Sequence, residues 1–263
     1  MSYAEVNGQS LYFEEHGSGA GEALVLLHGG FGSGDTFAPL LPALTDGRKV
    51  VLVDLQGHGR TPDADRALRP ELLADDVAAL IKHLGLERAD VLGYSLGAKV
   101  ALRTAIQHPD AVRRLVLVSV PFKRDGWFPD VLVGMDQMSA AAAEMMKGSP
   151  PYNHYAEVAP RPEDWPVLVG KTAEALKTDF DWRDEVAALT MPVLLVYGDA
   201  DSIRPAHVAE FFALLGGGLK DAGWDNSYRP ASRLAILAGA SHYDILNSPT
   251  LVPSILPFLT SEV

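Results

Sequence analysis

Cysteine is absent from the 263 residues of this sequence. Its absence excludes disulfide bonds, a thiolate nucleophile and zinc sites with cysteine ligands. The sequence also lacks the H-E-x-x-H pattern and any close group of histidine and acidic residues that would indicate a metal centre. We therefore expect a protein that uses neither a metal nor a cofactor.

Positive charge is scarce. Lysine and arginine total 22 against 34 aspartate and glutamate residues, which gives a net charge of −12. Such a chain is repelled by the phosphates of nucleic acids and by an anionic membrane surface. We expect neither as a partner.

Long apolar stretches are missing as well. No run reaches the roughly 18 residues that a membrane-spanning helix needs. Residues 1–5 show neither the basic start nor the apolar run of a signal peptide. The expectation is a cytoplasmic protein, and nothing in the composition predicts an oligomeric state.

Short apolar runs, in contrast, are frequent, and they predict a sheet. Residues 3–15 predict two strands joined at Asn7-Gly8, a dipeptide suited to a tight hairpin because both residues tolerate positive φ. Six later runs are rich in valine, leucine and isoleucine and barely alternate, as in parallel strands buried on both faces. These runs are 23–27, 50–53, 89–92, 115–118, 193–196 and 234–237.

Helical patterns lie between several of these runs, at 71–84 and 98–107. Alternating strands and helices predict an α/β fold with helices on both faces of the sheet. Between residues 120 and 189 the alternation stops: the pattern predicts a helix at 131–147, a proline-rich stretch, and helices at about 164–178 and 182–189. We interpret 121–189 as a helical cap inserted into a core domain formed by 1–120 and 190–263. Residues 216–231 have no assigned role.

The segment Gly93-Tyr94-Ser95-Leu96-Gly97 follows a predicted strand and precedes a predicted helix. This G-x-S-x-G pattern predicts a sharp turn that exposes the serine hydroxyl. A Cβ at either flanking glycine would collide with the neighbouring strand or helix. The N–H of Leu96 would then lie at a helix N-terminus, where it can stabilise a developing oxyanion. The pattern makes Ser95 the candidate nucleophile.

A serine nucleophile needs a histidine base that is itself oriented by a carboxylate. The predicted strand 193–196 leads into Asp199 and Asp201, and the strand 234–237 leads into His242. Because the carboxyl ends of parallel strands share one edge of a sheet, these side chains can converge on Ser95. The remaining seven histidines lie elsewhere, and His28 and His58 are each followed by glycine in turns that they can brace.

The loop after the first long strand supplies candidate oxyanion donors. Its sequence, Leu27-His28-Gly29-Gly30-Phe31-Gly32-Ser33-Gly34, lets the backbone approach a substrate closely. The best candidate is the amide of Gly30, with Phe31 as the alternative, and the sequence does not separate them.

Together these motifs resemble the α/β-hydrolase superfamily, near its esterase and lactonase branches. The similarity spans most of the chain and is weakest over the cap. The motifs that carry it are His28-Gly29-Gly30, the turn from Asp54 to Thr61, the Ser95 elbow, Gly198-x-x-Asp201 and Gly239-x-x-His242.

The resemblance implies an eight-stranded, mostly parallel sheet flanked by helices, a small helical cap after the sixth strand, and hydrolysis through an acyl-enzyme. It assigns the nucleophile to Ser95, the acid to Asp201 rather than Asp199, the base to His242, and the oxyanion amides to Leu96 and the Gly30 loop. Thr61 departs from the family, where serine is commoner, but that turn is structural.

The expected function is hydrolysis of small to medium carboxylic esters. Carbon–carbon bond hydrolases, lactonases, acyltransferases and perhydrolases share the same residues and stay open, as does a non-catalytic ligand receptor. A serine in the elbow argues against dehalogenases and epoxide hydrolases, which use aspartate there. A nucleotide-binding oxidoreductase is disfavoured because the third glycine of G-x-G-x-x-G would fall on Asp35, whose carboxylate repels pyrophosphate.

The expected partner is therefore a small ester or related acyl compound. We expect its pocket to include Tyr94, Trp127, Met135 and Met138. These two methionines fall on one face of the predicted helix with Met145 and Met146. The face either packs the cap on the sheet or lines an adaptable acyl pocket.

Overall fold

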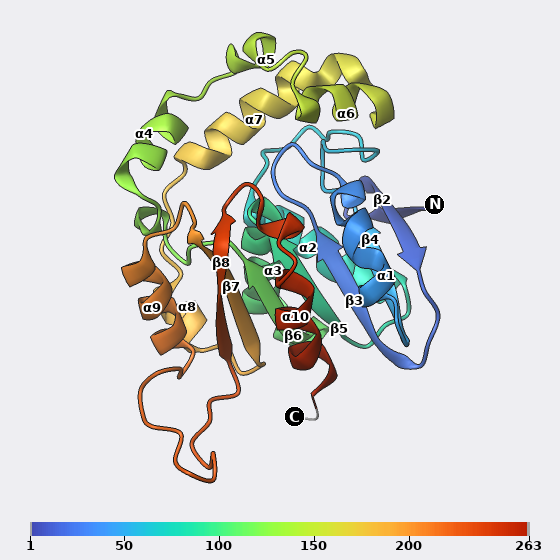
Figure 1. The fold of residues 1–263 in the computed structure, drawn as a ribbon. Helices are drawn as coiled ribbons and strands as arrows, with labels where there is room; N and C mark the ends of the chain where they lie inside the picture. The colour runs from blue at the N-terminus through green and yellow to red at the C-terminus, as the bar shows by residue number, and fades with distance from the viewer. Residues whose placement is uncertain (1, 262–263) are drawn as a thin grey trace.

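A computed structural model describes residues 2–261 of the chain (Figure 1). Its eight strands form one sheet in the order β1-β2-β4-β3-β5-β6-β7-β8. β1 pairs with β2 and β2 with β4 in antiparallel fashion, and the other neighbours are parallel. The strands are β1 Ser2–Val6, β2 Gln9–His16, β3 Gly21–Leu27, β4 Arg48–Val53, β5 Ala89–Tyr94, β6 Val112–Val118, β7 Val193–Ala200 and β8 Arg233–Ser241. The predicted eight-stranded, mostly parallel sheet is confirmed.

Residues 2–261 also form ten α-helices and five short 3-10 helices, most of which connect the strands. The α-helices are α1 Leu41–Leu44, α2 Pro70–His83, α3 Leu96–Gln107, α4 Pro129–Gln137, α5 Ala142–Met145, α6 Pro150–Val158, α7 Trp165–Lys177, α8 Arg183–Ala187, α9 Pro205–Leu214 and α10 Leu251–Thr260. The 3-10 helices are η1 Gly34–Leu40, η2 Pro109–Ala111, η3 Arg124–Gly126, η4 Pro162–Asp164 and η5 Ile245–Asn247. None of these helices is both long and apolar enough to cross a bilayer.

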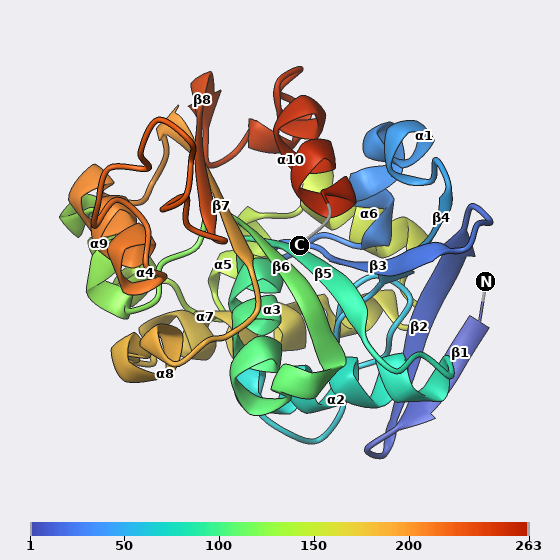
Figure 2. The ribbon, with the colours of Figure 1, turned by 90° about the horizontal axis from the view of Figure 1, so that it is seen from below.

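Successive residues of the central strands point to opposite faces of the sheet, so each strand contributes to two cores. Val25, Leu27 and their counterparts pack with α2, α3, α8 and α9 on one face. Leu24 and Leu26 pack with α1 and α10 on the other face. Figure 2 shows α2, α3 and α8 on one side of the sheet and α1 and α10 on the other. Burial on both faces explains why these strands are continuous apolar runs in the sequence.

The segment between β6 and β7 forms the helical layer over one end of the sheet. Figure 1 shows α4, α5, α6 and α7 arching across that end. α8 lies lower, where its Val186 belongs to the core on the α2 and α3 side of the sheet. The helices that lie over the sheet end are therefore α4 to α7. Residues 1, 262 and 263 of the expected core domain lie outside the described range.

The single helix predicted over 131–147 is wrong. α4 ends at Gln137, Met138 adopts extended backbone angles with ψ of 139°, and α5 begins only at Ala142. Because of this break, the methionines do not share one helix face. Met138 and Met146 pack inside the cap, whereas Met145 is 81% exposed. Helical spacing alone did not reveal the break, because methionine and alanine are compatible with a continuous helix.

Two buried histidines brace the loops that follow β3 and β4. His28 donates through Nδ1 to the carbonyl of Gly29 over 2.7 Å, and its Nε2 accepts the N–H of Leu55 at 3.0 Å. His58 Nδ1 lies 2.9 Å from the carbonyl oxygen of Gln56. Burial lowers the pKa of His28 to about 4 and, with the charge of His28, that of His58 to about 3. Both rings are neutral near pH 7, as loop-bracing residues should be.

These histidines predict a loss of stability in acid. A histidine whose pKa is lower in the folded than in the unfolded chain favours unfolding once the pH falls below its ordinary value of about 6.5. Each should cost about 1.4 kcal/mol per pH unit from there down to its folded pKa. When the pH falls from about 7.5 to about 5, the free energy of unfolding should decrease in both proteins. The decrease should be about 2 kcal/mol smaller in His58→Asn than in wild type, as measured by urea titration at each pH.

The matched control is His83→Asn on α2. The side chain of His83 is exposed, so the same exchange there removes no buried neutral ring. If the free energy of unfolding falls with pH as steeply in His58→Asn as in wild type, His58 is not a buried neutral ring that destabilises the fold in acid.

Candidate active site

Three side chains that come from distant parts of the sequence meet at the carboxyl edge of the sheet. Ser95 follows β5, Asp201 follows β7, and His242 follows β8. Ser95 Oγ lies 3.1 Å from His242 Nε2, and His242 Nδ1 lies 3.3 Å from Asp201 Oδ1. The structure thus places a hydroxyl, an imidazole and a carboxylate in one continuous hydrogen-bonded series.

Ser95 occupies a backbone conformation that non-glycine residues rarely adopt, with φ of 52° and ψ of −113°. The surroundings enforce it. A Cβ at Gly93 would overlap the carbonyl of Gly97, and a Cβ at Gly97 would overlap the carbonyl of Leu27. The predicted steric role of both glycines is confirmed. The turn holds Ser95 at the start of α3, with Leu96 as the first residue of that helix.

Asp201 is held from several sides. Its Oδ2 accepts the hydroxyl of Ser119 at 2.6 Å and the N–H of Gly198 at 3.2 Å, and its Oδ1 accepts the N–H of Ile203 at 3.3 Å. Burial by itself raises the pKa of this carboxyl, but the hydrogen bonds from His242 and Ser119 outweigh it and lower the pKa below its usual value. Asp201 is therefore ionised at neutral pH, as an orienting carboxylate must be.

Ser119 was missed by the sequence reasoning. It is fully buried, directly follows β6, and has a positive φ of 58°. A polar residue at the carboxyl end of a central strand is the same signal that pointed to Asp201. Applied to every strand, that signal would have found Ser119.

Asp199, the alternative acid, lies two residues before Asp201 and is exposed. Its Oδ1 accepts the N–H of Gly239 at 2.9 Å, in the segment that leads to His242. The structure therefore brings Asp201, and not Asp199, within hydrogen-bond reach of the imidazole. Asp199 instead supports the backbone that carries His242.

Two predicted pocket residues flank the imidazole of His242. The Tyr94 hydroxyl donates to the carbonyl of His242 at 2.7 Å, and the two ring centroids are 5.7 Å apart. Burial, reinforced by the charge of Asp201, raises the pKa of Tyr94 to about 12, so its hydroxyl stays a donor. The ring of Trp127 meets the imidazole edge to face at 5.3 Å. Both side chains restrict the ring to the orientation that faces Ser95.

The other two predicted pocket residues lie in the cap. Met138 packs against a cluster formed by Ala143, Tyr155, Trp165, Leu168 and Val169, which we call the cap cluster. Met135 lies on α4 and is partly exposed.

The candidate oxyanion donors lie beside Ser95. A Cβ at Gly29 would be 2.8 Å from the ring of Tyr94 and 3.5 Å from Cβ of Ser95, so the loop backbone lies directly against the nucleophile. The N–H of Gly32 donates to the carbonyl of Gly29 at 3.1 Å, which closes a turn with Gly30 and Phe31 at its centre. Both candidates sit on this one turn.

A groove of about 850 Å³ lies elsewhere, between the start of α2, the side of α3 and residues 178–182. Lys99, Arg103 and Phe180 are among its lining residues, but Ser95, Asp201 and His242 are not. The chemistry of the hydrogen-bonded series, rather than the size of a hollow, therefore identifies the candidate site.

Known proteins share this sequence pattern. The family model described as alpha/beta hydrolase fold matches residues 22–161. The pimeloyl-[acyl-carrier protein] methyl ester esterase of Aeromonas hydrophila is 32% identical over 254 residues, which cover 88% of this chain and 92% of that protein. The putative carbamate hydrolase RutD of Caulobacter is 35% identical over 232 residues, covering 78% of this chain and 82% of that protein.

A solved structure shares the fold. The enol-lactonase from Burkholderia xenovorans matches with a TM-score of 0.74 and 24% identity, covering 98% of this chain and all of that chain. At this level of identity the likeness concerns the arrangement of the sheet and helices.

The same substitution should have different effects at Asp199, near the end of β7, and at Asp201, directly after β7. Asp201→Asn should lower kcat for ester hydrolysis by about 10⁴-fold, because an amide favours the wrong tautomer of His242. Asp199→Asn should lower it by less than about tenfold, since Asp199 touches only the supporting backbone. Steady-state kinetics on a p-nitrophenyl ester measures both, and the reverse order of losses would move the role to Asp199.

Proposed function

This chain belongs to the α/β-hydrolase family, and from its candidate site we propose that it is a serine carboxylesterase acting on small to medium esters through an acyl-enzyme. The observation that carries the proposal is the contact of Ser95 with His242, and of His242 with Asp201, at 3.1 Å and 3.3 Å. Because one fold supports many reactions, the proposal rests on this site rather than on the sheet.

In the first half-reaction, His242 Nε2 takes the proton of Ser95 as Oγ attacks the ester carbonyl carbon. Asp201 keeps the proton of His242 on Nδ1 and stabilises the imidazolium that forms. His242 then gives its proton to the leaving alcohol, and the acyl group remains on Ser95. Water repeats the same sequence on the acyl-enzyme and releases the acid.

The negative charge that develops on the carbonyl oxygen needs donors fixed in advance. The N–H of Leu96 is one, because the first N–H groups of α3 have no partner within the helix and carry the positive end of its dipole. The amide of Gly30 or Phe31 on the adjoining turn is the other.

Ester chemistry is favoured by the relatives. The Aeromonas hydrophila protein is named for the methyl ester of a pimeloyl-[acyl-carrier protein], which is a carboxylic ester of a small alcohol. In this chain, Trp127 beside His242 supplies apolar surface against which an acyl group can lie. We propose short to medium acyl chains on a small alcohol.

The nucleophile can be tested directly. Ser95→Ala should lower kcat by about 10⁴-fold or more and abolish labelling by a fluorophosphonate, while thermal stability stays close to that of wild type. A variant that retains a tenth of the wild-type activity would remove Ser95 from the mechanism. Wild-type protein that resists the probe would favour a ligand receptor.

Substrate length gives a second test. Across a p-nitrophenyl ester series, kcat/KM should rise about fourfold for each methylene that is buried, which corresponds to about 0.8 kcal/mol, and then fall once the pocket is filled. A preference for chains beyond about twelve carbons, or activation by a lipid interface, would indicate a lipase instead. Monomethyl pimelate, simple lactones and carbamates belong in the same panel. Faster turnover of a lactone or a carbamate would replace the ester assignment.

A further inference from the structure

Phe31 adopts a left-handed backbone conformation, with φ of 61°. Glycine adopts this conformation without strain, whereas in a residue with a bulky side chain it causes steric strain. Glycines stand on both sides, at Gly30 and Gly32. The strained position of the turn is therefore the one that carries a side chain, and the surrounding structure must hold it there.

The conformation of Phe31 decides which way one peptide of the turn faces. With the turn closed from Gly29 to Gly32, the peptide between Gly30 and Phe31 is its central one. Turns with positive φ at the third residue have this peptide rotated by about 180° relative to turns with negative φ. When this peptide rotates, the N–H of Phe31 and the carbonyl of Gly30 exchange sides of the turn. One arrangement offers a donor to an oxyanion, and the other offers a carbonyl that repels it.

The contact that holds Phe31 comes from the cap. Its ring centroid lies 5.5 Å from that of Trp165, at the start of α7. Trp165 is 1% exposed, and its indole N–H donates to the carbonyl of Ala143 at 3.1 Å. The rings of Tyr152 and Tyr155 lie 5.5 Å and 5.2 Å from the indole. Trp165 is thus fixed by the cap cluster and can fix Phe31 in turn.

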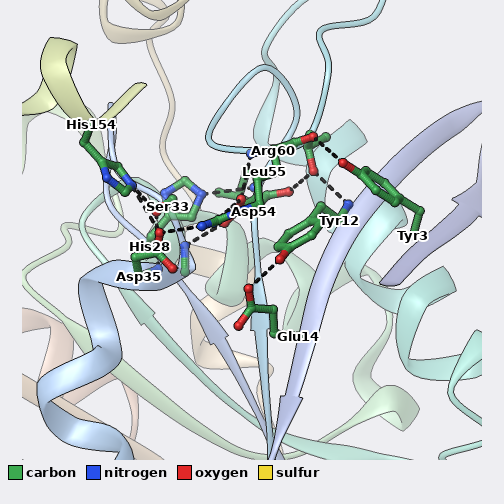
Figure 3. Close-up of polar contacts among 12 residues, drawn as sticks. Tyr3, Tyr12, Glu14, His28, Ser33, Asp35, Asp54, Leu55, Arg60 and His154 are labelled. Atoms are coloured by element: carbon green, nitrogen blue, oxygen red, sulfur yellow. Dashed lines mark hydrogen bonds and ion pairs between the residues drawn. The ribbon is translucent and has the colours of Figure 1, made fainter. Parts of the chain in front are cut away.

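The far end of the same loop is fixed independently. Ser33 Oγ lies 2.7 Å from Nε2 of His154 on α6 (Figure 3). Below it, Asp54 at the end of β4 accepts the N–H of Gly34 at 2.6 Å and that of Arg60 at 2.7 Å. With Ser33 and Gly34 anchored to both cap and core, the central peptide is the part of the loop whose direction depends on Phe31.

We propose that Trp165 is a positioning residue for catalysis: through the ring of Phe31 it holds the central peptide of the turn in the orientation that offers an amide N–H to the oxyanion. This rests on the proposed ester hydrolysis at Ser95. Trp165 touches no reacting atom, so its effect should fall on transition-state stabilisation rather than on substrate binding.

The test is a double-mutant cycle between the two rings. Trp165→Leu should lower kcat by roughly 10-fold to 100-fold with KM changed by less than about threefold. Trp165→Phe, which keeps an aromatic contact, should restore kcat to within about threefold of wild type. In a Phe31→Gly background, Trp165→Leu should cost less than about twofold, because glycine keeps the left-handed conformation without an anchor.

Val169→Ala is the matched control for general loosening of the cap. Val169 is fully buried in the same cluster and on the same helix as Trp165. Its replacement should lower Tm but leave kcat within about twofold of wild type. An equal loss of kcat in Val169→Ala, or an equal cost of Trp165→Leu in the Phe31→Gly background, would overturn the proposal.

Two further measurements test the role of Trp165 without relying on Trp165→Leu alone. If Trp165→Leu does not fold, Phe31→Ala removes the same contact from the loop side and should show the same loss of kcat without a change in KM. The affinity for phenylboronic acid, whose tetrahedral adduct with Ser95 places a boronate oxygen where the oxyanion would lie, should fall in parallel with kcat. Inactivity of the wild type towards every ester would instead defeat the proposed function. An active wild type with unchanged kcat in Trp165→Leu defeats only the role of Trp165.

Discussion

The close approach of α3 to the sheet at Gly93 and Gly97 is the constraint on which the rest of the site depends. No side chain fits at either position, because Gly93 faces the carbonyl of Gly97 and Gly97 faces that of Leu27. The approach forces Ser95 into its strained turn and brings β3 beside it, so that the loop after β3 lies against the nucleophile. Every other functional group has to converge on the point that this contact defines.

The loops that converge there are rigid because their polar groups are satisfied internally. Asp54 joins the loops after β3 and β4 through two backbone N–H groups, and the neutral ring of His28 links the same two loops. On the other side, Ser119 and backbone amides hold Asp201, while Tyr94 holds the carbonyl of His242. A site prearranged in this way needs little reorganisation when charge develops in the transition state.

The cap contributes to the site in two ways that differ in kind. Trp127 lies against the imidazole of His242, where we propose that the acyl group binds. Trp165 and His154 contact the loop after β3 instead, at Phe31 and Ser33. If our two proposals hold, variation in the cap alters substrate preference through the first contact and catalytic rate through the second, without any change in the core.

The sequence by itself determined the sheet, the strained elbow at Ser95 and the strand-end positions of Asp201 and His242, because backbone sterics and strand polarity act within a few residues. It missed Ser119 and joined α4 and α5 into one helix. Only the tertiary structure decided those points and the pairing of Phe31 with Trp165. The partners are far apart in the sequence, by 82 residues for Ser119 and Asp201 and by more than a hundred for Phe31 and Trp165. Their geometry depends on packing between elements, which no local pattern records.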